Sequence, residues 1–91
     1  MAKQIKAIET PALDQILTPE LLGQAIKARR TQSHLRLEDA AALCGVAKQT
    51  FMNIEHGQST SQFGSILKIC AALGVTLRIQ PWLDEDEDVW Q

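Results

Sequence analysis

Two short helical patterns separated by a glycine-started turn, within residues 37–57, constrain the fold of this 91-residue chain more than any other feature. The first pattern, LEDAAALC, has acidic residues in its first turn, where negative charge suits the helix dipole, and it ends at Gly45. In the second, AKQTFMNIEH, the residues Ala47, Phe51 and Ile54 lie together on one side at 100° per residue. The sequence therefore predicts two helices joined by a tight turn, for which glycine leaves the necessary steric room.

Three further helices are indicated elsewhere in the chain. Two begin at Thr-Pro pairs, with the threonine hydroxyl as cap and proline in the first helical position, and run over about residues 11–17 and 19–32. The third lies in STSQFGSILKICAALG, capped by one of residues 59–61 and closed by Gly74. We therefore expect an all-α domain of about five helices.

A change of period follows the last helix. The segment VTLRIQP alternates Val75, Leu77 and Ile79 with polar residues, which predicts a short strand stopped by Pro81. A lone strand satisfies neither its backbone nor its apolar face, so it needs a partner strand. We expect that partner to be the same strand of a second subunit in a homodimer; the alternative is pairing within one chain with the N-terminal segment KQIKAI.

Composition narrows the class of protein. Hydrophobic residues make up 45% of the chain and charged residues 22%, which is ordinary for one globular domain and too apolar for general disorder. The sequence has no membrane-spanning stretch and no secretory signal, so we expect a cytoplasmic, nucleoid-associated protein. Cys44 and Cys70 stand far apart inside apolar helical patterns, which indicates reduced core residues rather than a disulfide or a metal site.

The charge is unevenly distributed along the chain. The formal net charge is −2, but five of the eleven acidic residues lie in DEDED, residues 84–88. Residues 1–83 carry nine Lys and Arg against six acidic residues. A mildly basic body with an acidic tail is compatible with a nucleic-acid partner for the body.

Two short helices joined by a three-residue turn form a helix-turn-helix, which presents its second helix to the major groove of DNA. On the outward side of that helix, Gln49 and Asn53 can each offer a donor and an acceptor to an adenine edge. Lys48 can reach guanine or phosphate, and Met52 can lie against a thymine methyl group. These four side chains are the expected base readers, and a merely solvated polar face is the alternative.

A second group of side chains is expected to hold phosphates and so to position the domain without reading bases. The group comprises Arg36, Thr50, His56, Gln58 and Ser59. For His56 the alternative is that a histidine near a helix end complements the helix dipole and binds nothing.

Residues 22–58 resemble the Cro/CI-like, or Xre, family of DNA-binding domains, whose fold is that of lambda repressor, and the likeness continues through SILKICAALGV. The matching positions are Leu22-Gly23, Ile26, Arg30, Leu35, Ala41, Gly45-Val46, Thr50, Ile54-Glu55 and Gly57. The resemblance implies an ion pair between Arg30 and Glu55 that ties the first long helix to the recognition helix. Ala47 departs from the family's Ser or Thr and is a poor N-cap, so packing of Phe51 and Ile54 must position that helix.

A small domain of this family followed by a dimerising strand resembles the HipB-type antitoxins, which repress their own operon and bind a kinase-like toxin. The resemblance implies a type II toxin-antitoxin system, an operator of double-stranded DNA and a HipA-like partner. Trp90, behind the acidic run, is then a candidate anchor for partner docking; a solubilising tail is the alternative.

We accordingly divide the chain into four segments: an N-terminal arm with a short helix (1–17), the helix-turn-helix domain (18–74), the strand (75–81) and the acidic tail (82–91). Neither histidine has a neighbour at catalytic or metal-binding spacing, so we expect no enzyme activity, cofactor or metal. Two other functions stay open: a free-standing or phage-type repressor without a toxin, and a protein-interaction adaptor on the same scaffold.

Overall fold

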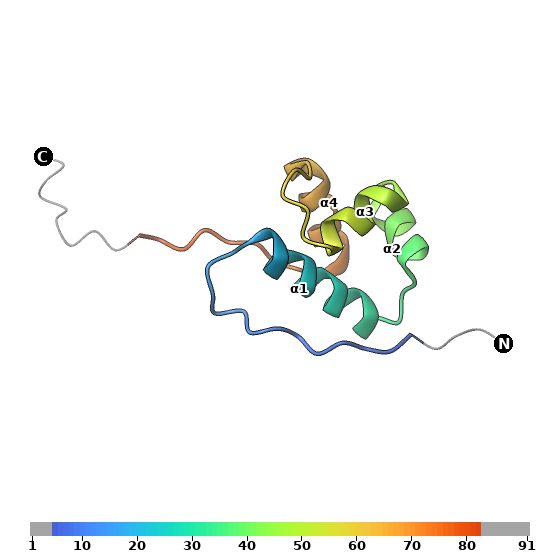
Figure 1. Ribbon diagram of the computed structural model, residues 1–91, viewed down its shortest axis with the longest axis horizontal. Helices are drawn as coiled ribbons and strands as arrows, with labels where there is room; N and C mark the ends of the chain where they lie inside the picture. Colours follow the sequence, from blue (N-terminus) through green and yellow to red (C-terminus); the bar gives the residue numbers. More distant parts are fainter. Residues whose placement is uncertain (1–4, 83–91) are drawn as a thin grey trace, which may run out of the picture.

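The computed structural model describes residues 5–82 and contains four helices in that range. They are α1 (Pro19–Gln32), α2 (Leu37–Cys44), α3 (Lys48–Glu55) and α4 (Phe63–Leu73). The helices pack into one body, and extended segments precede α1 and follow α4 (Figure 1). The expected all-α fold is confirmed. None of the helices in residues 5–82 is long and apolar enough to cross a membrane.

The core lies where the four helices meet. Ile26 of α1, Phe51 of α3 and Ile69 of α4 are its largest fully buried side chains. Cys44 and Cys70 belong to the same core as free thiols, as the sequence predicts. Burial raises the pKa of both thiols above the ordinary value of 9.0, so they stay protonated at neutral pH.

The sequence signals correctly mark the start of α1 and the C-terminal ends of α2 and α4. The Oγ1 atom of Thr18 accepts a 3.0 Å hydrogen bond from the Leu21 amide and so caps α1. Gly45 and Gly74 take left-handed conformations, with φ of 73° and 78°, and end α2 and α4. The expected cap of α4 is wrong: Gln62 holds that position without a side-chain cap, and Ser61 bonds the Gln58 carbonyl instead.

Residues 11–17 are not helical, which corrects the expected fifth helix. Leu13, Ile16 and Leu17 are exposed, so a helix here would gain no buried face, and seven residues are too few to form a stable helix alone. The preceding residues run along α1 instead (Figure 1). The Ile8 amide donates to Oγ1 of Thr31 at 3.0 Å, and the Ile8 carbonyl accepts from Nε2 of Gln32 at 2.8 Å.

Residues 75–82 form no strand in this single chain, although the alternating pattern predicts one. The physical reason is that a strand needs a partner, and the described part of KQIKAI, residues 5–8, lies against α1 and bonds Thr31. Val75 and Leu77 are half-buried against the helical core, whereas Ile79 is exposed. The pairing within one chain is therefore not formed here.

Candidate nucleic-acid interface

Helix α3 is anchored by its apolar side and shows its polar side to solvent. Phe51 and Ile54 are buried in the core. No side chain caps the helix at Ala47, so its position depends on this packing, as the sequence predicts. The turn before α3 is fixed through its backbone, because the Val46 amide donates to the carbonyl of Ala41 at 3.0 Å.

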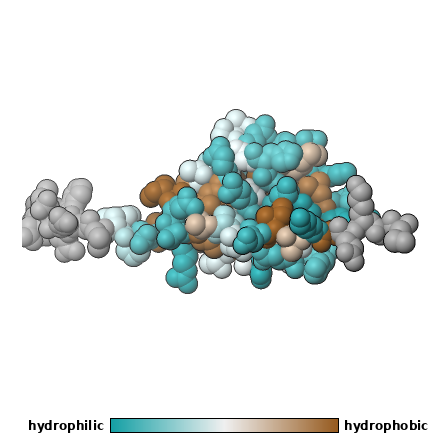
Figure 2. Space-filling model, turned by 60° about the horizontal axis from the view of Figure 1, so that its bottom comes forward, coloured by the Kyte–Doolittle hydropathy of each residue, from teal (hydrophilic) through white to brown (hydrophobic). Residues whose placement is uncertain are grey.

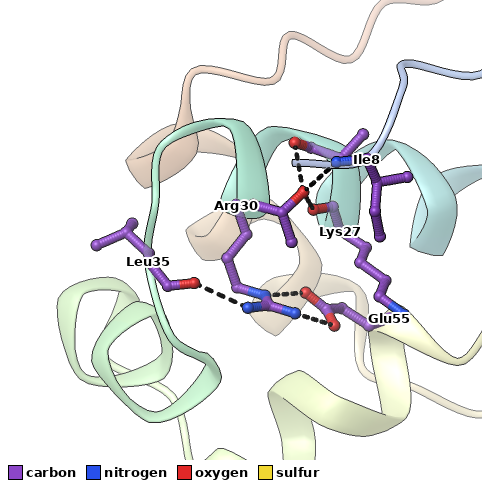
Figure 3. Close-up of polar contacts among 7 residues, drawn as sticks. Ile8, Lys27, Arg30, Leu35 and Glu55 are labelled. Carbon is purple, nitrogen blue, oxygen red and sulfur yellow. Dashed lines mark hydrogen bonds and ion pairs between the residues drawn. The ribbon is translucent and has the colours of Figure 1, made fainter. Parts of the chain in front are cut away.

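The structure brings Arg30 and Glu55 together, as the family resemblance implies. The guanidinium of Arg30 donates two hydrogen bonds to the carboxylate of Glu55, 2.5 Å from Nε to Oε2 and 3.1 Å from Nη2 to Oε1 (Figure 3). The side chains are only 10% and 2% exposed, so water screens this pair very little. Arg30 also donates from Nη1 to the Leu35 carbonyl at 2.8 Å. One side chain thus ties α1 to the turn before α2 and to the end of α3.

A second constraint on α3 is the close approach of α1. A Cβ atom placed on Gly23 would lie 2.6 Å from the carbonyl oxygen of Ile54 and closer still to that of Glu55. Glycine is therefore required where the backbone of α1 meets the last turn of α3. This contact and the buried ion pair hold the same end of α3.

The four expected base readers all lie on the outward side of α3. Lys48 and Gln49 are exposed, and Met52 and Asn53 are half-buried. The ammonium of Lys48 lies 3.5 Å from the carboxylate of Glu38, and both side chains are more than half exposed. Nε2 of Gln49 donates to Oδ1 of Asn53 at 2.9 Å.

Sequence reasoning missed both of these contacts. The spacing of four residues between Gln49 and Asn53 was a usable signal, because amide side chains one turn apart in a helix can bond. The pair of Glu38 and Lys48 joins two helices, and no spacing rule within one helix could have found it.

The expected phosphate-binding residues are spread around the ends of α2 and α3. Arg36 is exposed at the start of α2, and His56 is exposed at the end of α3. Thr50 is half-buried. Gln58 and Ser59 are exposed in the following loop, where they also line an apolar groove of about 220 Å³. The backbone amides of His56 and Gln58 donate to the carbonyls of Met52 and Asn53 at 3.0 and 3.1 Å, so both residues are held at the end of α3.

Two of the expected dimer residues, Val75 and Leu77, lie beside the beginning of α1, where they line a groove of about 520 Å³ together with Leu17 and Leu22. Leu77 also lines the smaller groove that Gln58 and Ser59 border. Ile79 is 88% exposed and Trp82 is 81% exposed. Figure 2 shows a mostly hydrophilic surface on which hydrophobic residues form separate groups. Trp90, the expected partner anchor, lies outside the described residues.

Metal ligands do not gather in the part of the chain that the structure covers. Within residues 5–82, no three of the His, Cys, Asp and Glu side chains are grouped so that they could hold a metal ion. The polar groups are satisfied internally there: no buried side-chain nitrogen or oxygen in that range lacks a hydrogen-bond partner. The outward side of α3 carries the amide groups of Gln49 and Asn53, the ammonium of Lys48 and the thioether of Met52.

Comparison with known proteins agrees with this geometry. A family model described as "Helix-turn-helix domain" matches residues 21–79. The chain is similar to the "Uncharacterized HTH-type transcriptional regulator y4mF" of Sinorhizobium fredii (strain NBRC 101917 / NGR234). The two are 29% identical over 65 residues, which are 71% of this chain and 86% of that protein.

Solved structures of similar fold include the "HipB-O4 20mer complex" and the "Structure of HipA-HipB-O2-O3 complex". Each matches with a TM-score of 0.67 and 22% identity, over 76% of this chain and 97% of the solved chain.

Proposed function

The chain belongs to the helix-turn-helix domain family, and we propose that it is a sequence-specific DNA-binding repressor of transcription that reads its operator with α3. The observation that carries the proposal is the two-sided character of this helix. Phe51 and Ile54 are buried, so the opposite side, with Gln49 and Asn53, is free to enter a groove. The "HTH-type transcriptional regulator" in the name of the similar Sinorhizobium fredii protein supports the same function.

The groups on this side suit base recognition. Gln49 and Asn53 offer amide donors and acceptors for an adenine edge, and Met52 offers an apolar contact for a thymine methyl group. Lys48 suits guanine or a phosphate. Phosphate contacts fix the register of the domain on the duplex. The five residues expected to make them are Arg36, Thr50, His56, Gln58 and Ser59.

We propose that the repressor is a homodimer joined through residues 75–81. The support is that this segment is extended, with Val75 and Leu77 half-buried and Ile79 exposed. A second copy of the segment would supply the missing partner strand. Two-fold symmetry then places two recognition helices about 34 Å apart, as a palindromic operator requires. Mutation of Ile79 to Asp is expected to give a monomer in analytical ultracentrifugation, and an unchanged mass would contradict the interface.

The finer proposal is an antitoxin of HipB type in a type II toxin-antitoxin operon, with a HipA-like toxin as partner. The support is architectural: the fold is shared with HipB, which has been solved in a complex with HipA. A free-standing repressor is the alternative, and the gene beside this one separates the two. If the toxin is present, a pulldown that survives deletion of residues 84–91 would contradict docking through the tail.

A duplex-binding assay tests the central proposal. The probe is the DNA upstream of the chain's own gene, and the proteins are the intact chain, a Gln49→Ala, Asn53→Ala variant and a Gln24→Ala control on the exposed side of α1. We expect the intact chain and the control to bind with an affinity that falls steeply with salt. The double variant should lose preference for this DNA over unrelated duplex. No duplex binding at low salt would favour the adaptor function.

A further inference from the structure

The two amide side chains expected to read bases are bonded to each other. Nε2 of Gln49 lies 2.9 Å from Oδ1 of Asn53, one helical turn further along the outward side of α3. The bond has a direction: Gln49 donates and Asn53 accepts. Independent readers of two bases would not need such a link, so its effect on base recognition has to be worked out.

The bond leaves the recognition groups of Gln49 available. A primary amide has two N–H donors and a carbonyl oxygen with two lone pairs. The link uses one N–H of Gln49, which keeps its second N–H and its carbonyl oxygen. Adenine presents the N7 acceptor and the N6 amino donor side by side in the major groove, and these match the groups that remain. Gln49 can therefore bind adenine while it stays bonded to Asn53.

The link also reduces what binding costs. A free glutamine side chain rotates about three torsions, and fixing a rotamer-rich side chain at an interface costs affinity. In α3 the bond to Oδ1 of Asn53 restricts Gln49 before any DNA is present. Asn53 keeps both of its own N–H donors for an acceptor on a neighbouring base pair or a phosphate.

From this geometry we propose that Asn53 is the positioning residue for Gln49, and that the linked amides select an A·T base pair as one unit. The inference rests on the proposed function, since it concerns how the same surface chooses its operator. It goes further by assigning Asn53 a role that acts through Gln49. The essential group is the acceptor oxygen of Asn53, which gives a test by conservative replacement.

The experiment is selection of bound duplexes from a random pool by the intact chain and four variants. Gln49→Ala identifies the base-pair position that Gln49 reads. Asn53→Ala removes the acceptor, whereas Asn53→Asp keeps an acceptor oxygen at the same place and removes the donors. Gln24→Ala on α1 is the control. Circular dichroism checks that each variant is folded.

We expect the intact chain to prefer A·T at the position identified by Gln49→Ala, by roughly tenfold. Asn53→Ala should reduce that preference by about 3- to 10-fold, the effect of releasing one ordered side chain. Asn53→Asp should bind all duplexes more weakly, because its charge faces phosphates, yet keep the A·T preference at the Gln49 position. Gln24→Ala should keep both the overall affinity for duplex and the A·T preference of the intact chain.

Three results would overturn the inference. The first is an A·T preference at the Gln49 position that Asn53→Ala leaves unchanged, and the second is a loss of that preference in Asn53→Asp as large as in Asn53→Ala. The third is that Gln49→Ala changes the preference at no position. Each of these leaves a sequence-specific DNA-binding protein in place. If the intact chain itself enriches no sequence, the proposed function fails as well. The two failures are therefore distinguishable from the behaviour of the unmodified protein.

Discussion

Replacing Arg30 by methionine should destabilise the domain more than any exposed substitution. The change leaves the carboxylate of Glu55, whose side chain is 2% exposed, without the two bonds it receives from Arg30. It also removes the 2.8 Å bond to the carbonyl of Leu35. Leaving one partner of a buried ion pair unpaired costs about 3–5 kcal/mol, because the remaining charge stays desolvated.

This cost is large compared with the whole free energy of unfolding. At about 0.05–0.15 kcal/mol per residue, a chain of 91 residues has a stability of roughly 5–14 kcal/mol. For a domain of this size, 1 kcal/mol shifts the melting temperature by about 4–8 °C. Arg30→Met should therefore lower the melting temperature by roughly 12–40 °C, measured by circular dichroism on heating.

A double-mutant cycle by urea denaturation tests the reasoning behind this magnitude. Glu55→Leu alone should also be destabilising, but Arg30→Met combined with Glu55→Leu should recover most of the loss, because no buried charge remains. We expect the free energy of unfolding of the double variant to lie within about 1–2 kcal/mol of that of the intact chain. The remaining difference is the lost hydrogen bond to the Leu35 carbonyl. The exposed pair of Lys48 and Glu38 is the control, and breaking it with Glu38→Gln should cost under about 1 kcal/mol. Single-variant effects that simply add in the double variant would refute the buried pair.

Three further predictions concern packing, charge and pH. Gly23→Ala should lower the free energy of unfolding, measured by denaturation, by about 1–3 kcal/mol, because the added Cβ meets the carbonyls of α3. Gly64→Ala has open space around its Cβ and should cause no such loss; equal effects of the two changes would contradict the close approach of α1 and α3. Glu38→Gln should bind duplex a few-fold more tightly at low salt in fluorescence anisotropy, since it removes a negative charge beside Lys48; weaker binding would contradict a role for Lys48 at DNA. Burial raises the pKa of both core thiols above 9.0, so the stability that they contribute is complete below pH 9 and is lost as the pH rises further. Denaturation at pH 8 and pH 10 checks this against a variant with alanine at both cysteines, and identical alkaline losses in the two proteins would count against it.

The sequence predicted the helices best where local chemistry determines their ends. Thr18 and Pro19 mark the start of α1, and Gly45 and Gly74 mark the ends of α2 and α4 in the conformations that glycine favours. The buried side of α3 followed from periodicity, because Phe51 has the same neighbours on the helix surface in any fold.

Long-range contacts set the limits of prediction. The Thr-Pro signal before residues 11–17 resembles the one before α1, but only α1 finds a core on which to pack. The alternation around Leu77 indicates which side chains share a face and says nothing about which segment pairs with them.

At the candidate site, the identities of the surface groups were readable from the sequence and their mutual contacts were not. The pair of Arg30 and Glu55 was implied by the family resemblance, while the bond from Arg30 to Leu35 was not anticipated. Glu38 beside Lys48 joins α2 to α3, and such a pair depends on how the two helices cross.

The most direct test of α3 as the DNA-reading helix is nuclear magnetic resonance of the ¹⁵N-labelled protein titrated with operator duplex. We predict the largest amide shifts at residues 48–53 and at Arg36, with little change at residues 8–16 beside α1. Shifts confined to residues 75–79, or none in α3 at a saturating concentration of duplex, would contradict recognition by this helix.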